Sequence, residues 1–262
     1  MKILKQQSEW RDFRQSQAQS SVGFVPTMGA LHAGHMSLVA QARQSNDVVV
    51  VSIYINPTQF DQAADLNNYP QLLEQDLAQL QAAGVDAVLL PTYDWIYPDQ
   101  YTYQLSEHDL SGRFCGAHRP GHFDGVLTVV MKLLNMVGPK RAYFGEKDYQ
   151  QLHLIKGMAE AFFLPSEIIG CATMREQDGL AMSSRNLRLT AEQRSTAPLL
   201  YQVLSDKSSI AEKIQTLESA GFQVEYIEQL DDRLLAAVQL GEIRLIDNVS
   251  IGNSSAKQEK VA

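Results

Sequence analysis

The segment 48–55, Val-Val-Val-Val-Ser-Ile-Tyr-Ile, constrains the fold more than any other part of the chain. An unbroken apolar run rich in β-branched residues is typical of a strand that is buried on both faces in a parallel sheet. Further strand patterns occur at residues 22–25, 87–90, 141–144 and 168–173. Helical periodicity separates them at residues 35–45, 72–83, 126–134 and 152–163. This alternation predicts an α/β fold, a Rossmann-like open parallel sheet with helices on both faces.

The character of the sequence changes after Cys171. A polar, turn-rich connection at residues 177–186 leads into two helical patterns, at residues 191–204 and 210–220, and two strand patterns, at residues 222–227 and 243–246. We therefore expect two domains. Residues 1–171 form the sheet domain, and residues 172–262 form a smaller α+β domain hinged to it. The polar tail after Gly252 is expected to fray.

Charge and cysteine content narrow the class of protein. The formal net charge of -8 over 262 residues argues against broad binding to nucleic acid phosphates, although a local basic pocket for a nucleotide is compatible with it. Cys115 and Cys171 fit no metal or redox spacing, which favours reduced thiols in a cytosolic protein. The N-terminus has no apolar signal core, and no run approaches membrane-spanning length. We expect a cytoplasmic protein that binds neither nucleic acid nor membranes.

Two histidines three residues apart, His32 and His35, lie where the strand at residues 22–25 gives way to a helix. A helix that begins near Gly34 leaves its first backbone N–H groups unpaired, and Gly29 and Gly34 let a phosphate approach closely. Two imidazoles there can donate hydrogen bonds to a phosphoryl group whose charge rises in a transition state. The alternative is a helix cap or a satisfied surface residue. A metal site is less favoured, because no Cys or carboxylate nearby completes a ligand set.

Two further loops follow predicted strands, so they should open into the same crevice at the carboxyl ends of the sheet. The loop 56–60, Asn-Pro-Thr-Gln-Phe, offers uncharged amides that can hold a hydroxyl or carboxylate of a small substrate. In the loop 145–151, Gly-Glu-Lys-Asp-Tyr-Gln-Gln, Lys147 can meet a phosphate, and Asp148 a ribose hydroxyl or a magnesium ion. An ordinary polar turn and a solvated helix start are the respective alternatives.

Two turn-rich segments complete the candidate loops. Residues 182–186, Met-Ser-Ser-Arg-Asn, lie at the expected domain junction, where two hydroxyls and an arginine can clamp successive phosphates on closure. Residues 119–125 enter a helix, and Arg119 or His122 could face the crevice, with Asp124 as a candidate cap. Each segment also fits a plain surface turn or helix start. One aromatic alternation indicates a packed strand edge rather than a base-stacking platform: Tyr93, Trp95 and Tyr97.

Five segments carry a resemblance when taken in order. They are Pro26-Thr-Met-Gly-Ala-Leu-His-Ala-Gly-His-Met-Ser-Leu38, Asn56-Pro-Thr-Gln-Phe60, Arg119-Pro-Gly-His-Phe-Asp-Gly-Val126, Phe144-Gly-Glu-Lys-Asp-Tyr-Gln-Gln151 and Asp178-Gly-Leu-Ala-Met-Ser-Ser-Arg-Asn186. Together they resemble the signatures of the pantothenate synthetase family, the pantoate–β-alanine ligases. The similarity runs from about residue 22 to residue 186 and resumes weakly at residues 241–248. The His-x-Gly-His motif alone indicates only the wider nucleotidyltransferase and class I synthetase superfamily.

The resemblance implies a Rossmann-like N-terminal domain, a smaller C-terminal lid and a homodimer. It also implies a two-step, magnesium-dependent reaction. The pantoate carboxylate attacks the α-phosphate of ATP, which gives pantoyl adenylate and pyrophosphate. The amine of β-alanine then attacks the acyl carbon, which releases AMP and pantothenate. The partners implied are therefore three small molecules, namely pantoate, β-alanine and ATP.

The resemblance also carries site roles onto matching positions of this chain. His35 would be the catalytic histidine, supported by His32. Gln59 would hold pantoate and contribute to the β-alanine site, and Gln151 would also hold pantoate. ATP would be bound by Met28, Gly29, Ala30, Leu31, His32, Ala33, Gly34, His35, Gly145, Glu146, Lys147, Asp148, Met174, Met182, Ser183, Ser184 and Arg185. Adenylation needs charge stabilisation at the α-phosphate more than a protein nucleophile, and we assign that catalytic role to His32, His35, Lys147, Ser183, Ser184 and Arg185.

The chain departs from the family pattern at two places. Ala33 stands where the family often has an acidic residue, and Gln75 stands beside Asp76 where two acidic residues can lie near magnesium. No metal ligand is therefore assigned from the sequence. The part after Thr190 is shorter and less typical than in the family.

Three rival functions are weighed against the ligase. A nucleotidyltransferase would need extra cations for a phosphorylated acceptor, whereas residues 56–60 and Gln151 offer uncharged amides. A non-catalytic nucleotide-binding protein would not require His32, His35, Lys147 and Arg185 together. A class I aminoacyl-tRNA synthetase is disfavoured by the acidic balance of the chain and by the lack of an RNA-binding extension.

Overall fold

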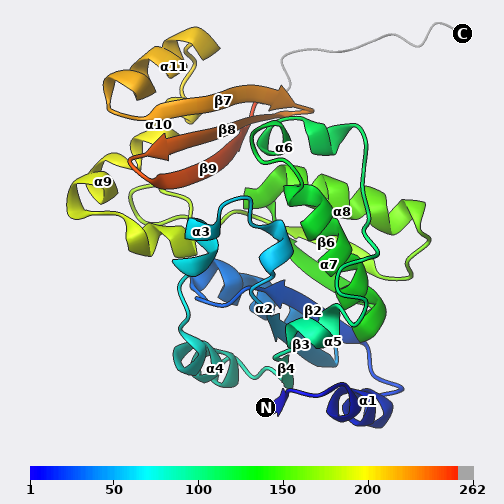
Figure 1. Ribbon diagram of the computed structural model, residues 1–262. Coiled ribbons are helices and arrows are strands. Elements are labelled where there is room, and N and C mark those ends of the chain that lie inside the picture. The colour runs from blue at the N-terminus through cyan, green and yellow to red at the C-terminus, as the bar shows by residue number, and fades with distance from the viewer. Residues whose placement is uncertain (253–262) are drawn as a thin grey trace, which may run out of the picture.

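The computed structural model describes residues 1–252, and its larger part is a six-stranded parallel sheet (Figure 1). The strand order is β1-β4-β3-β2-β5-β6. The bounds are β1 Lys2–Leu4, β2 Val22–Thr27, β3 Val48–Ile53, β4 Ala87–Leu89, β5 Arg141–Gly145 and β6 Glu167–Cys171. Every pair in this sheet is parallel. The predicted Rossmann-like α/β fold is confirmed, with the valine-rich β3 inside the sheet between β2 and β4.

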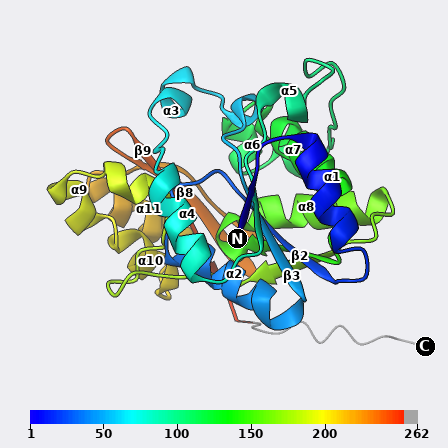
Figure 2. The same cartoon turned by 90° about the horizontal axis from the view of Figure 1, so that it is seen from below.

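Helices cover both faces of this sheet, as the alternation of side chains on β3 requires. Val48 and Val50 belong to one apolar cluster and Val49 and Val51 to another, and each is at most 5% exposed. The first cluster packs under α1 (Gln7–Ser16), α7 (His122–Val137) and α8 (Tyr149–Ala161). The second packs under α2 (Ala33–Ser45) and α4 (Leu73–Ala82). Figure 2 shows α2 and α4 on one side of β2 and β3 and α1 and α7 on the other.

The C-terminal part is a three-stranded antiparallel sheet with helices beside it (Figure 1). Its elements are α9 Ala191–Thr196, α10 Leu199–Ser205, α11 Ile210–Ser219, β7 Gln223–Leu230, β8 Arg233–Leu240 and β9 Ile243–Ser250. It has an apolar cluster of its own, which includes the fully buried Leu200, Leu217 and Val238. The predicted α+β character is confirmed. The expectation about the tail concerns residues that, apart from Gly252 itself, lie outside those described.

Short elements connect the main ones. They are α3 Ala63–Asn67, α5 Tyr93–Ile96, α6 Cys115–His118 and the 3₁₀ helices η1 Pro57–Gln59, η2 Leu110–Gly112, η3 Glu146–Asp148 and η4 Ser184–Arg188. Of these, η1, η3 and η4 carry residues of the candidate loops. Among the described residues, no helix combines the length and apolarity that crossing a membrane would need.

Several sequence expectations about individual elements are wrong. The single helix at residues 191–204 breaks into α9 and α10 around Pro198, whose ring cannot continue a helix without a kink. The aromatic alternation is the helix α5, which Thr92 caps by accepting a hydrogen bond from the main chain of Trp95. Gly121, not Asp124, is the N-cap of α7, in a left-handed conformation with φ 76°. The sequence analysis missed β1, α1 and β8.

Candidate active site

A cavity of about 250 Å³ lies at the carboxyl ends of the parallel strands and gathers the predicted loops. This position is where open α/β sheets bind ligands. Most of the predicted site residues line it: Met28, His32, Gly34, His35, Gln59, Gly145, Lys147, Asp148, Gln151, Met174, Met182, Ser183, Ser184 and Arg185. Segments far apart in the sequence therefore meet at one cavity, and His35, Lys147 and Arg185 share it.

Five residues predicted to bind ATP do not line this cavity: Gly29, Ala30, Leu31, Ala33 and Glu146. The main-chain N–H groups of Ala30 and Leu31 donate to the two carboxylate oxygens of Asp76, at 2.9 and 2.7 Å. Asp76 is 1% exposed and holds the loop from behind. The side chain of Glu146 accepts from Arg233 at 2.7 Å, toward the C-terminal sheet. These five residues therefore do not contact a ligand that is confined to this cavity.

The two histidines cap the helix that they open. His32 is the N-cap of α2, and its Nδ1 accepts from the main-chain N–H of Gly34 at 3.1 Å. The Nδ1 of His35 accepts from the main-chain N–H of His32 at 3.3 Å. The sequence analysis expected the first N–H groups of this helix to be unpaired, but the Gly34 N–H is already bonded. The helix-cap alternative and the cavity position therefore both hold for these residues.

Both imidazoles are neutral in the folded protein. Burial, with the nearby Lys147 ammonium, lowers the pKa of His32 to about 4. Burial, with His32 next to it, lowers the pKa of His35 to about 3. Because Nδ1 accepts a hydrogen bond in each ring, the proton of the neutral ring resides on Nε2. Each ring can therefore donate one Nε2–H hydrogen bond, and neither provides a positive charge near pH 7.

Asn56 orients the side chain of Gln59 and has no capacity left for a substrate. Its Nδ2 donates to Gln59 Oε1 at 3.0 Å and to the Gly125 carbonyl at 3.2 Å. Its Oδ1 accepts from the hydroxyls of Tyr97 at 2.8 Å and Thr58 at 3.1 Å. With Asn56 1% exposed, these four bonds use all its donors and acceptors. Because Oε1 of Gln59 faces Asn56, its NH₂ group lies on the other side of the amide, where it can donate to a ligand in the cavity.

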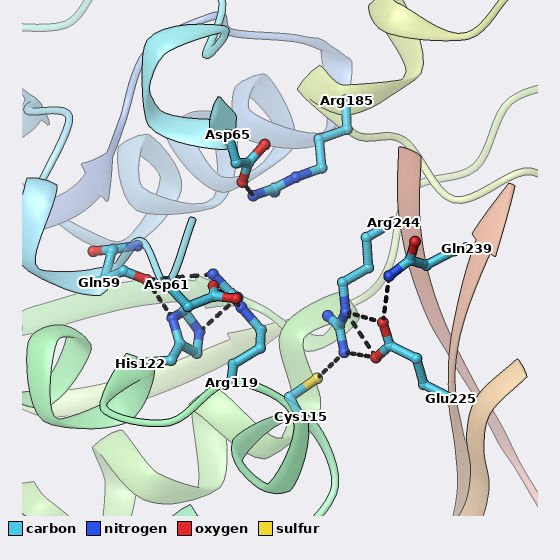
Figure 3. Close-up of polar contacts among 10 residues, drawn as sticks. All are labelled: Gln59, Asp61, Asp65, Cys115, Arg119, His122, Arg185, Glu225, Gln239 and Arg244. Carbon is cyan, nitrogen blue, oxygen red and sulfur yellow. Dashed lines mark hydrogen bonds and ion pairs between the residues drawn. The ribbon is translucent and has the colours of Figure 1, made fainter. Parts of the chain in front are cut away.

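Arg119 and His122 also line the cavity, as the sequence analysis considered (Figure 3). His122 Nδ1 lies 2.7 Å from the main-chain carbonyl oxygen of Gln59, and Nε2 lies 3.0 Å from Arg119 Nη1. Arg119 further donates to Asp61 at 2.7 Å and to the same Gln59 carbonyl at 3.3 Å. Both side chains are therefore bonded to the wall of the cavity.

The segment at residues 182–186, which we expected to clamp phosphates, is bonded to α3 and its surroundings, and the sequence analysis did not foresee these contacts. Arg185 donates to one carboxylate oxygen of Asp65 at 2.7 Å (Figure 3). Arg188 donates to the other oxygen at 2.8 Å. The hydroxyls of Tyr69 and Ser184 lie 3.2 Å apart in a buried contact. Asp65 and Tyr69 lie in a polar stretch without periodicity, so no sequence signal singled them out.

Two more residues were missed, although both lie in the predicted strand segments 48–55 and 168–173. The hydroxyls of Tyr54 and Thr173 line the cavity, and each is buried without a hydrogen-bond partner within the described chain. A buried polar group normally has a partner, because leaving it unpaired costs free energy. An oxygen-rich ligand in the cavity would supply the missing bonds.

A second, contiguous cleft of about 400 Å³ separates α3 from the C-terminal sheet. It shares Arg119, Lys147 and Arg185 with the first cavity. On its far wall Arg244 pairs with Glu225 at 2.7 Å and donates to the sulfur of Cys115 at 3.5 Å (Figure 3). This contact joins the C-terminal sheet to α6.

The site has few carboxylates for a metal ion. Within residues 1–252, no group of three or more His, Cys, Asp or Glu side chains is placed to hold one. Asp148 is the one carboxylate among the residues described as lining the first cavity. Both oxygens of Asp76 are taken by backbone N–H groups. A Mg²⁺ ion that depends on phosphate oxygens for most of its ligands is compatible with this arrangement.

Comparison with known families adds independent evidence. A sequence profile described as pantoate-beta-alanine ligase matches residues 2–250. The pantothenate synthetase of Bdellovibrio bacteriovorus is 53% identical over 249 residues, which cover 95% of this chain and 99% of that protein. The pantothenate synthetase of Coxiella burnetii is 50% identical over 248 residues, covering 95% of this chain and 96% of that protein.

Solved structures agree in fold over the whole length. The pantoate-beta-alanine ligase of Francisella tularensis, solved with beta-gamma ATP and beta-alanine, matches with a TM-score of 0.93 and 41% identity. That match covers 97% of this chain and 99% of the other. The pantothenate synthetase of Thermus thermophilus matches with a TM-score of 0.87 and 40% identity, covering 96% and 99% of the two chains.

Proposed function

The chain belongs to the pantoate-beta-alanine ligase family, and on that basis we propose how it joins pantoate to β-alanine to form pantothenate. The Francisella ligase, with beta-gamma ATP and beta-alanine bound, supports ATP and β-alanine as substrates of this chain as well. The observation that carries the proposal is the convergence on one cavity of two neutral histidines, Lys147, Arg185 and Gln59.

The first step is adenylation of pantoate. An oxygen of the pantoate carboxylate attacks the α-phosphorus of ATP, and the bond from that phosphorus to the oxygen bridging to the β-phosphate breaks. Pyrophosphate leaves with the electron pair, and pantoyl adenylate remains. The carboxylate is itself the nucleophile, so the protein needs to align the reactants and to stabilise charge on the phosphoryl oxygens.

The histidines act in this step as neutral donors. Their Nε2–H groups donate to the α-phosphate, whose oxygens gain charge in the transition state. The capping bonds at Nδ1 fix both rings before ATP binds, so little reorganisation is needed. Lys147 and Arg185 supply the positive charges, and Ser183 and Ser184 further donors, toward the β- and γ-phosphates.

Pantoate binds in the part of the cavity where amides meet an apolar wall. Gln59, with its NH₂ directed inward, and Gln151 hold oxygens of pantoate. The two methyl groups of pantoate pack against Val126, Val129, Val130 and Leu133, which line the same cavity. This apolar wall favours the ligase over the nucleotidyltransferase alternative, whose acceptor would carry a phosphate. Arg119, a cation that also lines the cavity, is bonded to Asp61, His122 and Gln59, so the phosphate of such an acceptor would have to compete with these bonds.

The second step makes the amide. The lone pair of the free amine of β-alanine attacks the acyl carbon, and the bond from this carbon to the AMP oxygen breaks. AMP leaves with the electron pair, and one of the two protons on the attacking nitrogen passes to water, so the amide keeps one N–H. Gln59, which is assigned to pantoate above, also orients β-alanine.

Mg²⁺ fits as a companion of ATP. The proposed ligands are phosphate oxygens, water and the Asp148 carboxylate, and the ion would neutralise charge on the leaving pyrophosphate. Three other expectations stay predictions: the domain boundary at residues 171–172 with a moving C-terminal lid, the homodimer, and the cytoplasmic location.

A product assay tests the proposal. With ATP and pantoate but no β-alanine, pyrophosphate should appear in an amount close to that of the enzyme, and adding β-alanine should then release AMP. ADP and phosphate as products would mean phosphorylation of the carboxylate and would contradict adenylation.

A further inference from the structure

We propose that His122 is a positioning residue for pantoate, which it serves by holding the main chain of Gln59 in place. The inference deepens the proposed function and rests on it, because Gln59 is the residue assigned to pantoate there. His122 itself is not assigned to any substrate, and neither of its ring nitrogens is free to contact one.

The tautomer of His122 follows from its neighbours. Arg119 carries a guanidinium, which donates hydrogen bonds and accepts none, and its Nη1 lies 3.0 Å from His122 Nε2. Nε2 must therefore be the acceptor, and the ring proton resides on Nδ1. Nδ1–H then donates to the carbonyl oxygen of Gln59 at 2.7 Å, and this oxygen can only accept. The ring is 8% exposed, so water does not compete for either bond.

The Gln59 carbonyl is held by two donors from one turn of chain. Arg119 Nη2 donates to the same oxygen at 3.3 Å, and Arg119 is itself fixed by Asp61 at 2.7 Å (Figure 3). Burial and the adjacent guanidinium lower the pKa of His122 to about 3. The ring therefore stays neutral, with the proton on Nδ1 that the bond to the Gln59 carbonyl requires.

The main chain of η1 is in close contact with α7 at Gly125. A Cβ atom at Gly125 would lie 2.3 Å from the Thr58 carbonyl oxygen and 2.8 Å from the Gln59 Cα. The backbone of η1 therefore rests directly on α7, one helical turn beyond His122. The hydrogen bonds from His122 and Arg119 and this contact together fix the position of the Gln59 main chain. Asn56 fixes the orientation of the Gln59 side-chain amide. A shift of about 1 Å in a binding group is enough to weaken a substrate contact substantially.

The test compares two amide variants that differ in where they place the donor. In His122→Asn the amide nitrogen is bonded to Cγ, as Nδ1 is in histidine, so it can still donate to the Gln59 carbonyl. In His122→Gln the amide lies one carbon farther out, near the place of Nε2, and this donor is lost. A matched control is His153→Asn, because His153 Nδ1 also lies near a main-chain oxygen, that of Tyr149 at 3.1 Å, but does not line the cavity.

The measurement is the KM for pantoate and for ATP, with kcat, in each purified variant, with folding checked by thermal melting. We expect His122→Gln to raise the pantoate KM about tenfold or more while the ATP KM stays within about twofold. His122→Asn should restore the pantoate KM to within about threefold of the unmodified enzyme, and His153→Asn should leave both values unchanged.

Two outcomes would overturn the inference: an unchanged pantoate KM in His122→Gln, or equal values for the Asn and Gln variants. A parallel rise of both KM values would mean a general structural role and would overturn it too. Failure of the unmodified enzyme to make pantothenate would instead remove the proposed function itself, so the two failures are distinguishable.

Discussion

Arg185 Nη2 lies 2.7 Å from a carboxylate oxygen of Asp65, so an arginine that we assign to phosphates is held by an acid from a different segment. The other Asp65 oxygen accepts from Arg188 at 2.8 Å. Burial alone would raise the pKa of Asp65, but the two guanidinium groups outweigh it and hold this pKa below its usual value. Asp65 therefore stays ionised and keeps Arg185 in place before a nucleotide binds.

Replacing Asp65 by Asn should weaken ATP binding. The amide keeps one acceptor but loses the charge that holds two arginines, so we expect the ATP KM to rise roughly threefold to tenfold and the pantoate KM to change less. The control is Glu167→Gln, which neutralises the exposed partner of Arg141 at 2.9 Å. An ATP KM that stays the same or falls in Asp65→Asn would show that Arg185 needs no such support.

Replacing His35 by Ala should reduce adenylate formation by about 100-fold or more with the fold intact, because a donor to the α-phosphate is lost. His35→Gln should retain more activity than His35→Asn, since only the longer amide can place a donor near the Nε2 position. The rate of pyrophosphate release reports this step. Near-normal rates in His35→Ala would remove the residue from its catalytic role.

The unfolding free energy should fall on mild acidification. His35 and His122 have folded-state pKa values near 3, below the ordinary 6.5, so the unfolded chain binds more protons once the pH drops below about 6.5. The contribution of these histidines to the unfolding free energy is therefore fully present above that pH. Below it, the unfolding free energy declines by roughly 1 kcal/mol per pH unit for each histidine down to about pH 4. Urea unfolding at pH 7.5 and 5 measures the loss. His122→Asn should flatten the profile, and an unchanged slope in this variant would count against a buried neutral ring.

Gln59 should matter for pantoate more than for ATP. Gln59→Ala removes the inward NH₂ donors, and we expect the pantoate KM to rise about tenfold or more. Gln59→Glu should be worse than Ala, because a carboxylate of the same shape repels the carboxylate of pantoate. Titration of each variant with pantoate and with ATP separates the two ligands. If pantoate affinity survives in Gln59→Ala, the assignment of this residue is wrong.

A methyl group at Gly125 should disturb the pantoate site through the backbone. In Gly125→Ala the new Cβ would lie 2.3 Å from the Thr58 carbonyl oxygen, so η1 must move away from α7. We expect lower stability and a raised pantoate KM. The matched control is Gly157→Ala in α8, where a Cβ meets nothing within 4 Å. Ala there should stabilise the helix by about 0.5–1 kcal/mol. Equal melting temperatures for the two variants would contradict the close contact.

Much of the architecture was predictable from side-chain patterning. Val48 and Val50 are buried on one face of β3 and Val49 and Val51 on the other, which is the burial on both faces that the unbroken apolar run predicted. Pro198 was visible as a helix breaker, but the helical spacing around it led us to predict one continuous helix. Thr92 was visible as a possible helix cap, but the aromatic alternation that follows it led us to predict a strand edge. β8 was missed although its residues 234–238 are all apolar, because the Leu and Ala residues there favour a helix at least as much as a strand.

Prediction of the site succeeded where residues follow strand ends and failed where contacts are long-range. His35, Gln59 and Lys147 lie in the segments that follow β2, β3 and β5, and the topology of the parallel sheet brings these segments together. Asp65 meets Arg185 across 120 residues of sequence, and no local pattern encodes such a pairing. The neutrality of the histidines likewise depends on burial, which the sequence alone does not specify.

The most direct test of the account follows the carboxylate oxygen of pantoate. Pantoate labelled with ¹⁸O in its carboxylate should be converted with ATP and β-alanine, and the AMP formed should be analysed by ³¹P NMR or mass spectrometry. Attack on the α-phosphorus predicts one labelled oxygen in the phosphate of AMP and none in pyrophosphate. Unlabelled AMP, or label in inorganic phosphate together with ADP, would contradict the adenylate mechanism.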